Sequence, residues 1–311
     1  AARDAFDQLS GEIHPSARTA LLEDSRLPRR AVLGRLSDGA PGGSLWGQAF
    51  GNWGDSDGNR NAAPMRRDTW GFVAGADVAL GDKATNGMAA AYLDTDLDVR
   101  ARNSSGSAKT IHVLGYAGVR TGRFGIKAGI GYAWADIDTK RSVVFAGFGD
   151  ALAAAYDGSM LQGFAELGYR VPLGEGHVEP FANIAAVRAM TDGFTETGDA
   201  GALTIARTTE KTTVSTVGLR FETAPAAAFS IRGLLGWQHG YGRLDPEGVH
   251  AFAGGAPFAI LGAAQSRNAG VATIEARFHA SSGLDISVAY DGVLGGQSQD
   301  HAIKGTIRVV F

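Results

Sequence analysis

The stretch RFGIKAGIGYAW, residues 123–134, divides its side chains into two sets by alternate position. One set holds Arg123, Lys127 and three glycines. Successive side chains of a β-strand point to opposite faces, so the stretch predicts a strand with one apolar and one polar face. The apolar face carries aromatic residues at both ends: Phe124, Ile126, Ala128, Ile130, Tyr132 and Trp134.

The same alternation recurs along most of the chain after residue 43. The final stretch, IKGTIRVVF at 303–311, sets Ile303 and Val309 against Lys304 and Arg308 and ends on Phe311. Each segment is near or above the roughly 9–11 residues that a tilted membrane-crossing strand needs. The facing of the first segment is ambiguous, because Trp46, Phe50 and Trp53 do not share a parity. About twelve strands are predicted, near 44–54, 68–80, 86–98, 108–120, 123–137, 159–172, 176–190, 212–222, 227–240, 269–280, 283–292 and 301–311.

The predicted connections alternate in length. Long connections at 55–67, 99–107, 138–158, 191–211 and 241–268 alternate with short ones at 81–85, 121–122, 173–175, 223–226 and 281–282, and a moderate one follows at 293–300. Short turns on one rim and long loops on the other are typical of an outer-membrane barrel with an even number of strands. A soluble β-barrel with an apolar core is the alternative, and it gives no reason for this asymmetry between the rims.

Aromatic residues on the apolar faces lie near the predicted strand ends. Amphipathic aromatic rings prefer the boundary between membrane and water. The sequence therefore predicts two aromatic girdles around the barrel, formed by Phe124, Tyr132, Trp134, Tyr169, Phe229, Trp237, Tyr290 and Phe311.

The composition excludes several other classes of protein. The net charge of −3 and the lack of a Lys/Arg cluster argue against nucleic acid as a partner. There is no cysteine, so disulfides and thiolate metal sites are excluded. Glycine is the outlier, with 45 residues in 311, about twice the average usage of roughly 7%. The first residues lack the features of a signal peptide, so we expect a mature or trimmed C-terminal piece of an exported protein.

Residues 1–43 differ from the rest and form the first predicted domain; residues 44–311 form the barrel. The stretch 13–36 has helical spacing of its apolar residues, many charges, and Pro15 at a favourable first-turn position. Pro28 should kink or divide the helix. So many charges make it a poor membrane span, and we expect an α-helix within the polar lumen of an all-β transmembrane barrel of twelve antiparallel strands.

The chain resembles the translocator β-domain of the autotransporters, the type V secretion family. The resemblance is carried by LSGEIH and ALLEDSR in the helix, by GFVAGAD, QGFAELGYRV, VEPFANIA and DGFTETG in the barrel, and by the terminal aromatic strand. It implies a Gram-negative outer membrane, an N-terminal passenger that is absent here and is moved to the cell surface, and no cofactor. It also implies that the terminal Phe311 is the address read by the outer-membrane assembly machinery. The other expected partners are outer-membrane lipid and lipopolysaccharide, and we expect a monomer.

We expect no catalytic or metal site in this chain. One branch of the family cleaves its passenger at an asparagine pair in the linker helix, and here the first asparagine is Asn52. The best candidate for a catalytic cluster is His112 with Asp94 and Asp96, which we expect to serve instead as a hydrogen-bonding group of the lumen. The alternatives are a diffusion porin, which has no need of the leading helix, and an outer-membrane barrel hydrolase.

Several charged residues are predicted to line the lumen and to contact the helix. We expect Glu166, Glu179 and Glu275 to pair with arginines of the helix. The apolar stretch 250–264 is expected to fold as a hairpin over the pore or to help a passenger begin folding. The predicted lumen-lining set is Lys127, Glu166, Arg170, Glu179, Arg232 and Glu275.

Overall fold

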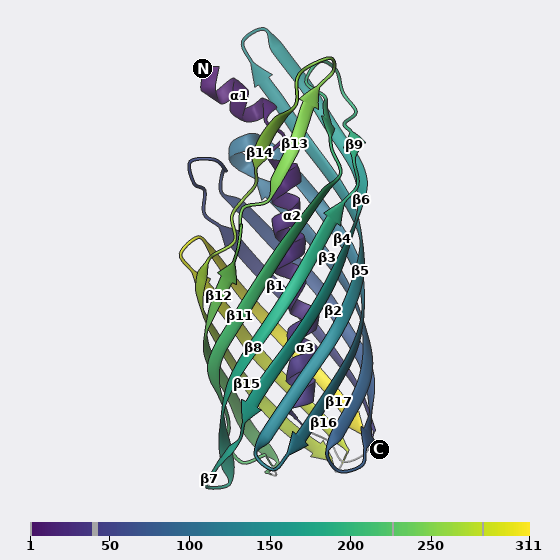
Figure 1. The fold of residues 1–311 in the computed structure, drawn as a ribbon, viewed down its shortest axis with the longest axis vertical. Coiled ribbons are helices and arrows are strands. Elements are labelled where there is room, and N and C mark those ends of the chain that lie inside the picture. Colours follow the sequence, from purple (N-terminus) through teal and green to yellow (C-terminus); the bar gives the residue numbers. More distant parts are fainter. Residues whose placement is uncertain (1, 39–42, 226, 282) are drawn as a thin grey trace.

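The chain forms one closed antiparallel β-barrel with a helical segment inside it (Figure 1). The computed structural model describes residues 2–38, 43–225, 227–281 and 283–311. Twelve long strands follow one another around the barrel in chain order, as the sequence predicted. They are β1 (Ser44–Ser56), β2 (Met65–Leu80), β3 (Ala84–Val99), β4 (Ser104–Thr121), β5 (Phe124–Phe145), β6 (Phe148–Tyr169), β8 (Gly176–Thr191), β11 (Thr208–Glu222), β12 (Phe229–Tyr241), β15 (Asn268–Ser281), β16 (Leu284–Gly295) and β17 (Ser298–Val310).

The barrel closes between its first and last strands. Strand β1 pairs with β17 from Ser44 opposite Val310 to Ser56 opposite Ser298. Beyond the end of this ladder, Gly43 and Phe311 exchange two backbone hydrogen bonds of 3.1 and 3.0 Å. An unpaired strand edge in hydrocarbon would leave backbone groups unsatisfied at several kcal/mol each, so closure is a requirement of this architecture.

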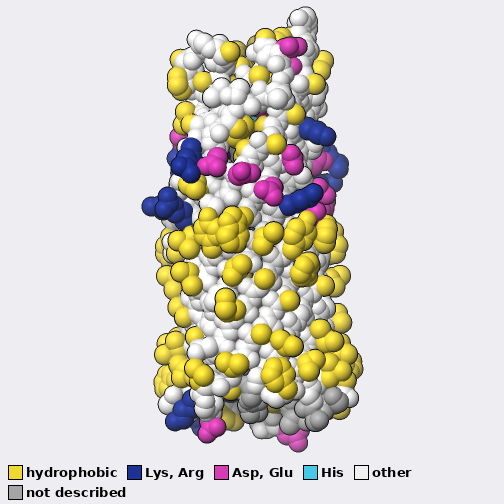
Figure 2. Space-filling view, turned by 90° about the vertical axis from the view of Figure 1, so that its right-hand side faces the viewer, with side chains coloured by type: hydrophobic (Ala, Val, Ile, Leu, Met, Phe, Trp, Pro, Cys, Tyr) yellow, Lys and Arg dark blue, Asp and Glu magenta, His cyan; other side chains and the backbone are white. Residues whose placement is uncertain are grey.

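An apolar band surrounds the lower part of the barrel (Figure 2). Ile130, near the middle of the apolar lower part of β5 between Phe124 and Trp134, is 61% exposed on this surface. A belt of charged residues bounds the band above (Figure 2). The ambiguous first strand is also resolved: Trp46 and Phe50 point inward and are buried, whereas Trp53 points outward and is half exposed.

The upper part of the barrel reverses this polarity. Above Trp134, strand β5 presents Asp136 and Lys140 to the outside, while Ile137 and Val143 are buried inside. The interior there is a conventional apolar core around the helix. The larger members of this core are Ile13, Leu21, Leu22, Met65, Leu97, Ile137, Tyr156, Met160 and Val187.

Three predicted connections are wrong. Residues 99–107 are not a long connection, because β3 ends at Val99 and β4 begins at Ser104 after one short turn. Residues 138–158 are not a long loop, because β5 continues to Phe145 and β6 begins at Phe148 after a turn at Gly147, whose φ is +79°. Residues 293–300 also contain only a tight turn, because β16 ends at Gly295 and β17 begins at Ser298. In these segments the cross-strand hydrogen bonds continue above the apolar band. The outward-facing apolar residues that predicted the strands end lower down, so the sequence pattern stops before the strands do.

Short strands and one 3-10 helix lie at the two rims. On the upper rim, β9 (Phe194–Thr195), β10 (Leu203–Ile205), β13 (Glu247–Phe252) and β14 (Phe258–Leu261) form a separate four-stranded sheet, and η1 (Arg100–Arg102) caps a turn. We call this four-stranded sheet the cap. On the lower rim β7 (Val171–Leu173) extends the edge of β8. The tight lower turns place Gly81, Gly122 and Gly174 at positive φ, where a side chain would be strained.

The N-terminal segment forms three helices, α1 (Ala2–Leu9), α2 (Ile13–Asp24) and α3 (Arg26–Ser37). Helix α1 lies at the upper rim, and α2 and α3 run down the inside of the barrel (Figure 1). Pro28 has no N–H to donate to the carbonyl of Asp24, and α2 ends at Asp24. The predicted division of the helix is thus confirmed. Among the residues described, no helix is long and apolar enough to cross a membrane.

Candidate functional site

The candidate site is the pore with the helix threaded through it. Eleven of the twelve residues of α2 are buried, including His14, Arg18 and Asp24. Burial of polar groups is costly unless they are hydrogen-bonded or paired. The contacts of these side chains therefore show how the helix is held.

At the upper end, His14 is tied to a loop that enters the pore. The Nε2–H of His14 donates to Glu196 at 2.8 Å, and the guanidinium of Arg141 on β5 binds both carboxylate oxygens of Glu196. Burial opposes ionisation of this carboxyl, but the hydrogen bonds from Arg141 and His14 hold the pKa of Glu196 at about 2. The aromatic rings of Tyr156 and Phe194 stack on each other and pack edge-on against His14.

The β13–β14 hairpin closes over the same end of the helix. The N–H of Ala263 donates to the Ser16 hydroxyl at 3.0 Å, and Arg18 donates to the carbonyl of Glu247 at 2.7 Å. Gly262 lies so close to Pro15 that an added Cβ would be 2.5 Å from its carbonyl carbon. The structure thus confirms that the apolar stretch 250–264 contains a hairpin over the pore.

At mid-height, the break between α2 and α3 coincides with a buried ionic network. The guanidinium group of Arg67 lies 3.1 Å from the Asp24 carboxylate, and that of Arg26 lies 2.9 Å from the Asp300 carboxylate. Arg67 also contacts Asp300, and Asn52 donates to the same carboxylate at 3.1 Å. The network joins the helix to β1, β2 and β17, the strands at which the barrel closes.

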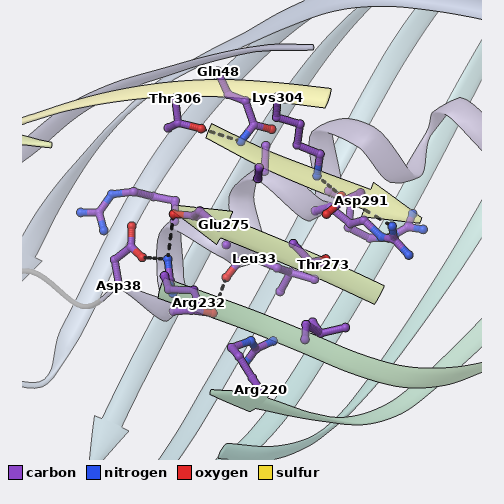
Figure 3. Close-up of a pocket in the computed structure, with 18 of the residues that line it drawn as sticks. Leu33, Asp38, Gln48, Arg220, Arg232, Thr273, Glu275, Asp291, Lys304 and Thr306 are labelled. Atoms are coloured by element: carbon purple, nitrogen blue, oxygen red, sulfur yellow. Dashed lines mark hydrogen bonds and ion pairs between the residues drawn. The ribbon is translucent and has the colours of Figure 1, made fainter. Parts of the chain in front are cut away.

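In the lower half the helix packs against one wall only. The apolar side of α3, with Leu27, Val32 and Leu36, contacts inward-facing residues of β1–β6 such as Trp46 and Phe164. Opposite this contact, a cavity of about 180 Å³ separates the other side of α3 from β11–β17 (Figure 3). Charged side chains line the cavity, so the lower lumen is polar whereas the upper lumen is apolar.

Four residues of the predicted lumen set form one cluster near the end of α3. The Lys127 ammonium donates to the Ser37 hydroxyl at 2.5 Å and to Glu166 at 2.7 Å. Arg170 donates to the Ser37 carbonyl and to Glu179, at 3.1 Å each. Lys127 and Arg170 therefore contact the helix directly, and Glu166 and Glu179 hold them.

The remaining two members surround Asp38, the residue after α3. Arg232 binds Asp38 and lies 3.7 Å from Glu275 (Figure 3). Arg277 and Arg308 approach the same Asp38 carboxylate at 2.8 and 3.3 Å. Sequence reasoning missed Asp38 because it opens a linker rich in glycine. Its position was a usable signal: a carboxylate just past a helix C-terminus is unfavourable beside the helix dipole unless cations surround it.

The expected pairing of Glu166, Glu179 and Glu275 with helix arginines is wrong. By strand register, Lys127 lies opposite Glu166, Arg220 opposite Glu179, and Arg232 opposite Glu275. Directly opposed side chains of neighbouring strands have Cβ atoms about 4.5–5.5 Å apart, so these opposite charges meet within the wall. The three glutamates are therefore neutralised within the barrel wall.

The helix arginines bind other groups of the wall. Arg35 lies 2.6 Å from Asp77, Arg30 lies 3.8 Å from Asp291, and Arg29 donates to the amide oxygen of Gln162 at 2.8 Å. Among the residues described, the wall carboxylates that pair with arginines of α3 are thus aspartates, whose short side chains leave room for the long guanidinium group. Arg26 also pairs with Glu23 of α2.

The candidate catalytic cluster does not exist. His112 points into the barrel and is buried beside Thr110, whereas Asp94 and Asp96 point outward. The residues lie on neighbouring strands, but their parities are opposite. Within the described part of the chain, no group of three or more potential metal ligands converges.

Comparison with known proteins identifies relatives of this fold. The family model for the autotransporter β-domain matches residues 45–291. Two proteins of Serratia marcescens, each named extracellular serine protease, are 31% and 30% identical to this chain over 99% of its length. The chain spans 31% of the length of these relatives.

Solved structures of three autotransporter domains share the fold. The translocator domain of NalP from Neisseria meningitidis has a TM-score of 0.79 at 16% identity, over 95% of this chain and 98% of that one. The transport unit of AIDA-I from Escherichia coli has a TM-score of 0.65 at 16% identity, over 86% and 90%. The β-domain of Bordetella BrkA has a TM-score of 0.61 at 18% identity, over 87% and 100%.

Proposed function

The chain belongs to the autotransporter family, and from this premise we propose that its pore carries an N-terminal passenger to the cell surface. The chain itself is an outer-membrane translocator domain. One observation carries the proposal: a polar helix runs through the closed barrel from the upper rim to the lower one (Figure 1). A passenger joined before α1 would therefore lie on the side of the cap, outside the cell.

We propose the two domains that the sequence suggested, with residues 1–43 as the linker and residues 44–311 as the barrel. The linker is held at both ends of the pore, by Glu196 above and by Lys127, Arg170 and Arg232 below. This arrangement suits a segment that remains in place after transport. It also favours a transporter without catalysis, because the ionisable groups along the helix are engaged in ion pairs and hydrogen bonds.

Surface display of the N-terminus tests the proposal. An epitope fused before Ala1 should be accessible to antibody and protease on intact cells. The matched control carries the same epitope in the lower turn at residues 81–83 and should be protected until the outer membrane is permeabilised. Protection of the N-terminal epitope on intact cells would contradict the proposed direction of transport.

A diffusion porin remains the main alternative, and conductance separates the two. We expect low conductance of residues 1–311 in planar bilayers, because the upper lumen is filled by apolar contacts around α2. A variant lacking residues 1–36 should conduct several-fold more. Equal conductance of the two proteins would favour a porin in which the helix does not occupy the pore.

We further propose that the barrel is a monomer and that outer-membrane assembly machinery reads Phe311 at its lower rim. The ring of Phe311 is 74% exposed, so it contributes little to packing within the barrel. Its backbone bonds to Gly43 do not need the ring. Phe311→Ala should therefore lower the outer-membrane yield in cells several-fold, whereas refolding of the same variant into detergent should be normal. Normal yield in cells would leave Phe311 as an ordinary interface residue.

A further inference from the structure

Two cations lie side by side on the outer surface of the barrel. Arg188 of β8 and Lys211 of β11 are directly opposed in the strand register, and both are exposed. Like charges in directly opposed positions repel each other. Within the described part of the chain, no carboxylate forms an ion pair with either side chain.

Two other outward cations of the barrel, Lys109 and Arg66, have acidic neighbours. On β4, Lys109 lies between Asp94 of β3 and Asp136 of β5 in the register. Arg66 pairs with Asp55 at 3.4 Å on the same outer surface. The pair of Arg188 and Lys211 is therefore a local excess of positive charge rather than part of an alternating pattern.

The pair stands at the upper border of the apolar band. Below Arg188, the outward positions of β8 are occupied in turn by Ala186, Ile184, Ala182, Pro180 and Val178. All five side chains are apolar. On the face drawn in Figure 2, charged side chains likewise border the apolar band above. In an outer membrane this border is the level of the headgroups of the outer leaflet, so both cations reach the headgroups and their phosphates.

Polar side chains lie directly below the pair of Arg188 and Lys211. Thr213 and Ser215 follow Lys211 on the outward face of β11. In the register β8 presents Ala186 and Ile184 opposite them, and β12 presents Tyr241 and His239. The Ser215 hydroxyl lies 2.9 Å from the Tyr241 hydroxyl of β12, and Thr213 is opposite Tyr241 in the register. Hydroxyl groups at this depth are suited to bind the sugar and phosphate oxygens of a lipid headgroup.

We propose that Arg188, Lys211, Thr213, Ser215 and Tyr241 form a binding site for the phosphorylated sugar headgroup of an outer-leaflet glycolipid, the lipid portion of lipopolysaccharide. Arg188 and Lys211 bind one phosphate between them and are relieved of their mutual repulsion. The three hydroxyls bind the sugar, and acyl chains lie along Leu161 of β6, opposite Arg188, and along Ile184. The proposal rests on the outer-membrane location and on the orientation proposed above, with the cap outside the cell.

Binding of defined lipids to the full chain tests the site. The purified barrel in detergent is titrated with bisphosphorylated lipid A, and bound lipid is counted by native mass spectrometry. The double variant R188Q/K211Q should bind at least tenfold more weakly, since hydrogen bonds to charged groups are about twice as strong as neutral ones. The matched control K109Q/K140Q removes two outward cations of β4 and β5 that share this face with Asp136 and Asp138, and it should bind like the parent protein. Heat-modifiable mobility in gels checks that each variant is folded.

Four outcomes would overturn the proposal. The first is equal binding by the parent protein and R188Q/K211Q. The second is an equal loss in K109Q/K140Q, which would indicate a general charge effect. The third is equal binding of lipid A stripped of both phosphates, which would indicate apolar contact alone. Competition by inorganic phosphate at a concentration matching the lipid would also overturn the assignment to a lipid, since it would show a site for the free ion.

Discussion

At the scale of single residues, Asp38 has more ionic contacts than its place in the sequence suggests. It lies just past the last turn of α3, and Arg232, Arg277 and Arg308 converge on its carboxylate. These arginines come from β12, β15 and β17, far apart in the chain. No local pattern could predict this cluster, because it depends on which strands the end of the helix reaches.

Asp38→Asn should release the lower end of the helix. Breaking a buried ion pair by removing one partner costs about 3 kcal/mol, because the three arginines then repel one another. We expect the barrel to stay folded while long open-pore events become far more frequent in planar bilayers. Asp82→Asn, in an exposed lower turn, is the control. Unchanged conductance of Asp38→Asn would mean that the upper contacts alone hold the plug.

A second residue-scale prediction concerns the outer face. Ile130 is exposed at the middle of the apolar band, so Ile130→Arg would place a charge in hydrocarbon. The free energy of unfolding should fall by about 2–4 kcal/mol, measured by urea titration in lipid vesicles, whereas Ile130→Leu should change it little. A cost below 1 kcal/mol would show that Ile130 lies near a headgroup region.

At the scale of elements, the sequence predicted strands where the outside is apolar and failed where it is charged. The period of two is present throughout β5, but above Trp134 its apolar positions move to the inside, as Ile137 and Val143 show. A prediction based on lipid-facing residues therefore places the end of each strand at the level of the lipid headgroups. The hairpin of β13 and β14 follows a different rule: His250 and the following Ala263 are buried, whereas Val249 is exposed and the rings of Phe252 and Phe258 stack on each other.

The cap itself should loosen as the pH falls. Burial lowers the pKa of His250 from its ordinary value of 6.5 to about 4, although the hydrogen bond to the Ser10 carbonyl opposes this shift. An undocked cap would bind a proton more readily, so acidification from pH 6.5 to 4 favours undocking by up to about 3 kcal/mol. Protonation of Glu196, whose pKa is about 2, acts in the same direction below pH 4.5.

Hydrogen exchange of residues 247–261, corrected for intrinsic rates, measures this effect. Protection should fall between pH 7.5 and pH 5 in the parent protein. His250→Gln keeps an N–H donor without titrating in this range, so its protection should depend much less on pH. An equal pH dependence in both proteins would assign the effect to another group.

At the scale of the whole molecule, the barrel consists of two halves that are stabilised differently. The lower half is sealed by lipid, where every backbone hydrogen bond must be satisfied within the ladder. The upper half depends on an apolar core to which α2 contributes Ile13, Leu21 and Leu22. The barrel and its threaded helix could be predicted from the sequence, whereas this second core could not, because it joins residues from the helix and from many strands.

Removal of residues 1–38 should therefore destabilise the two halves unequally. Loss of Ile13, Leu21 and Leu22 costs the upper strands on the order of 5 kcal/mol. Truncation also removes Leu27, Val32 and Leu36 from the lower lumen, but there lipid surrounds the strands and requires their backbone hydrogen bonds to stay formed. Amides of 133–145 and 148–160 should exchange much faster in the truncated barrel, whereas amides of 124–131 and 161–168 in the same strands should keep their protection in lipid vesicles. The full chain is the reference, and both halves of it should be protected. Loss of protection along the whole length of β5 and β6 would show that the helix stabilises the barrel as one cooperative unit, and unchanged protection in both halves would show that the upper strands hold together without their apolar core.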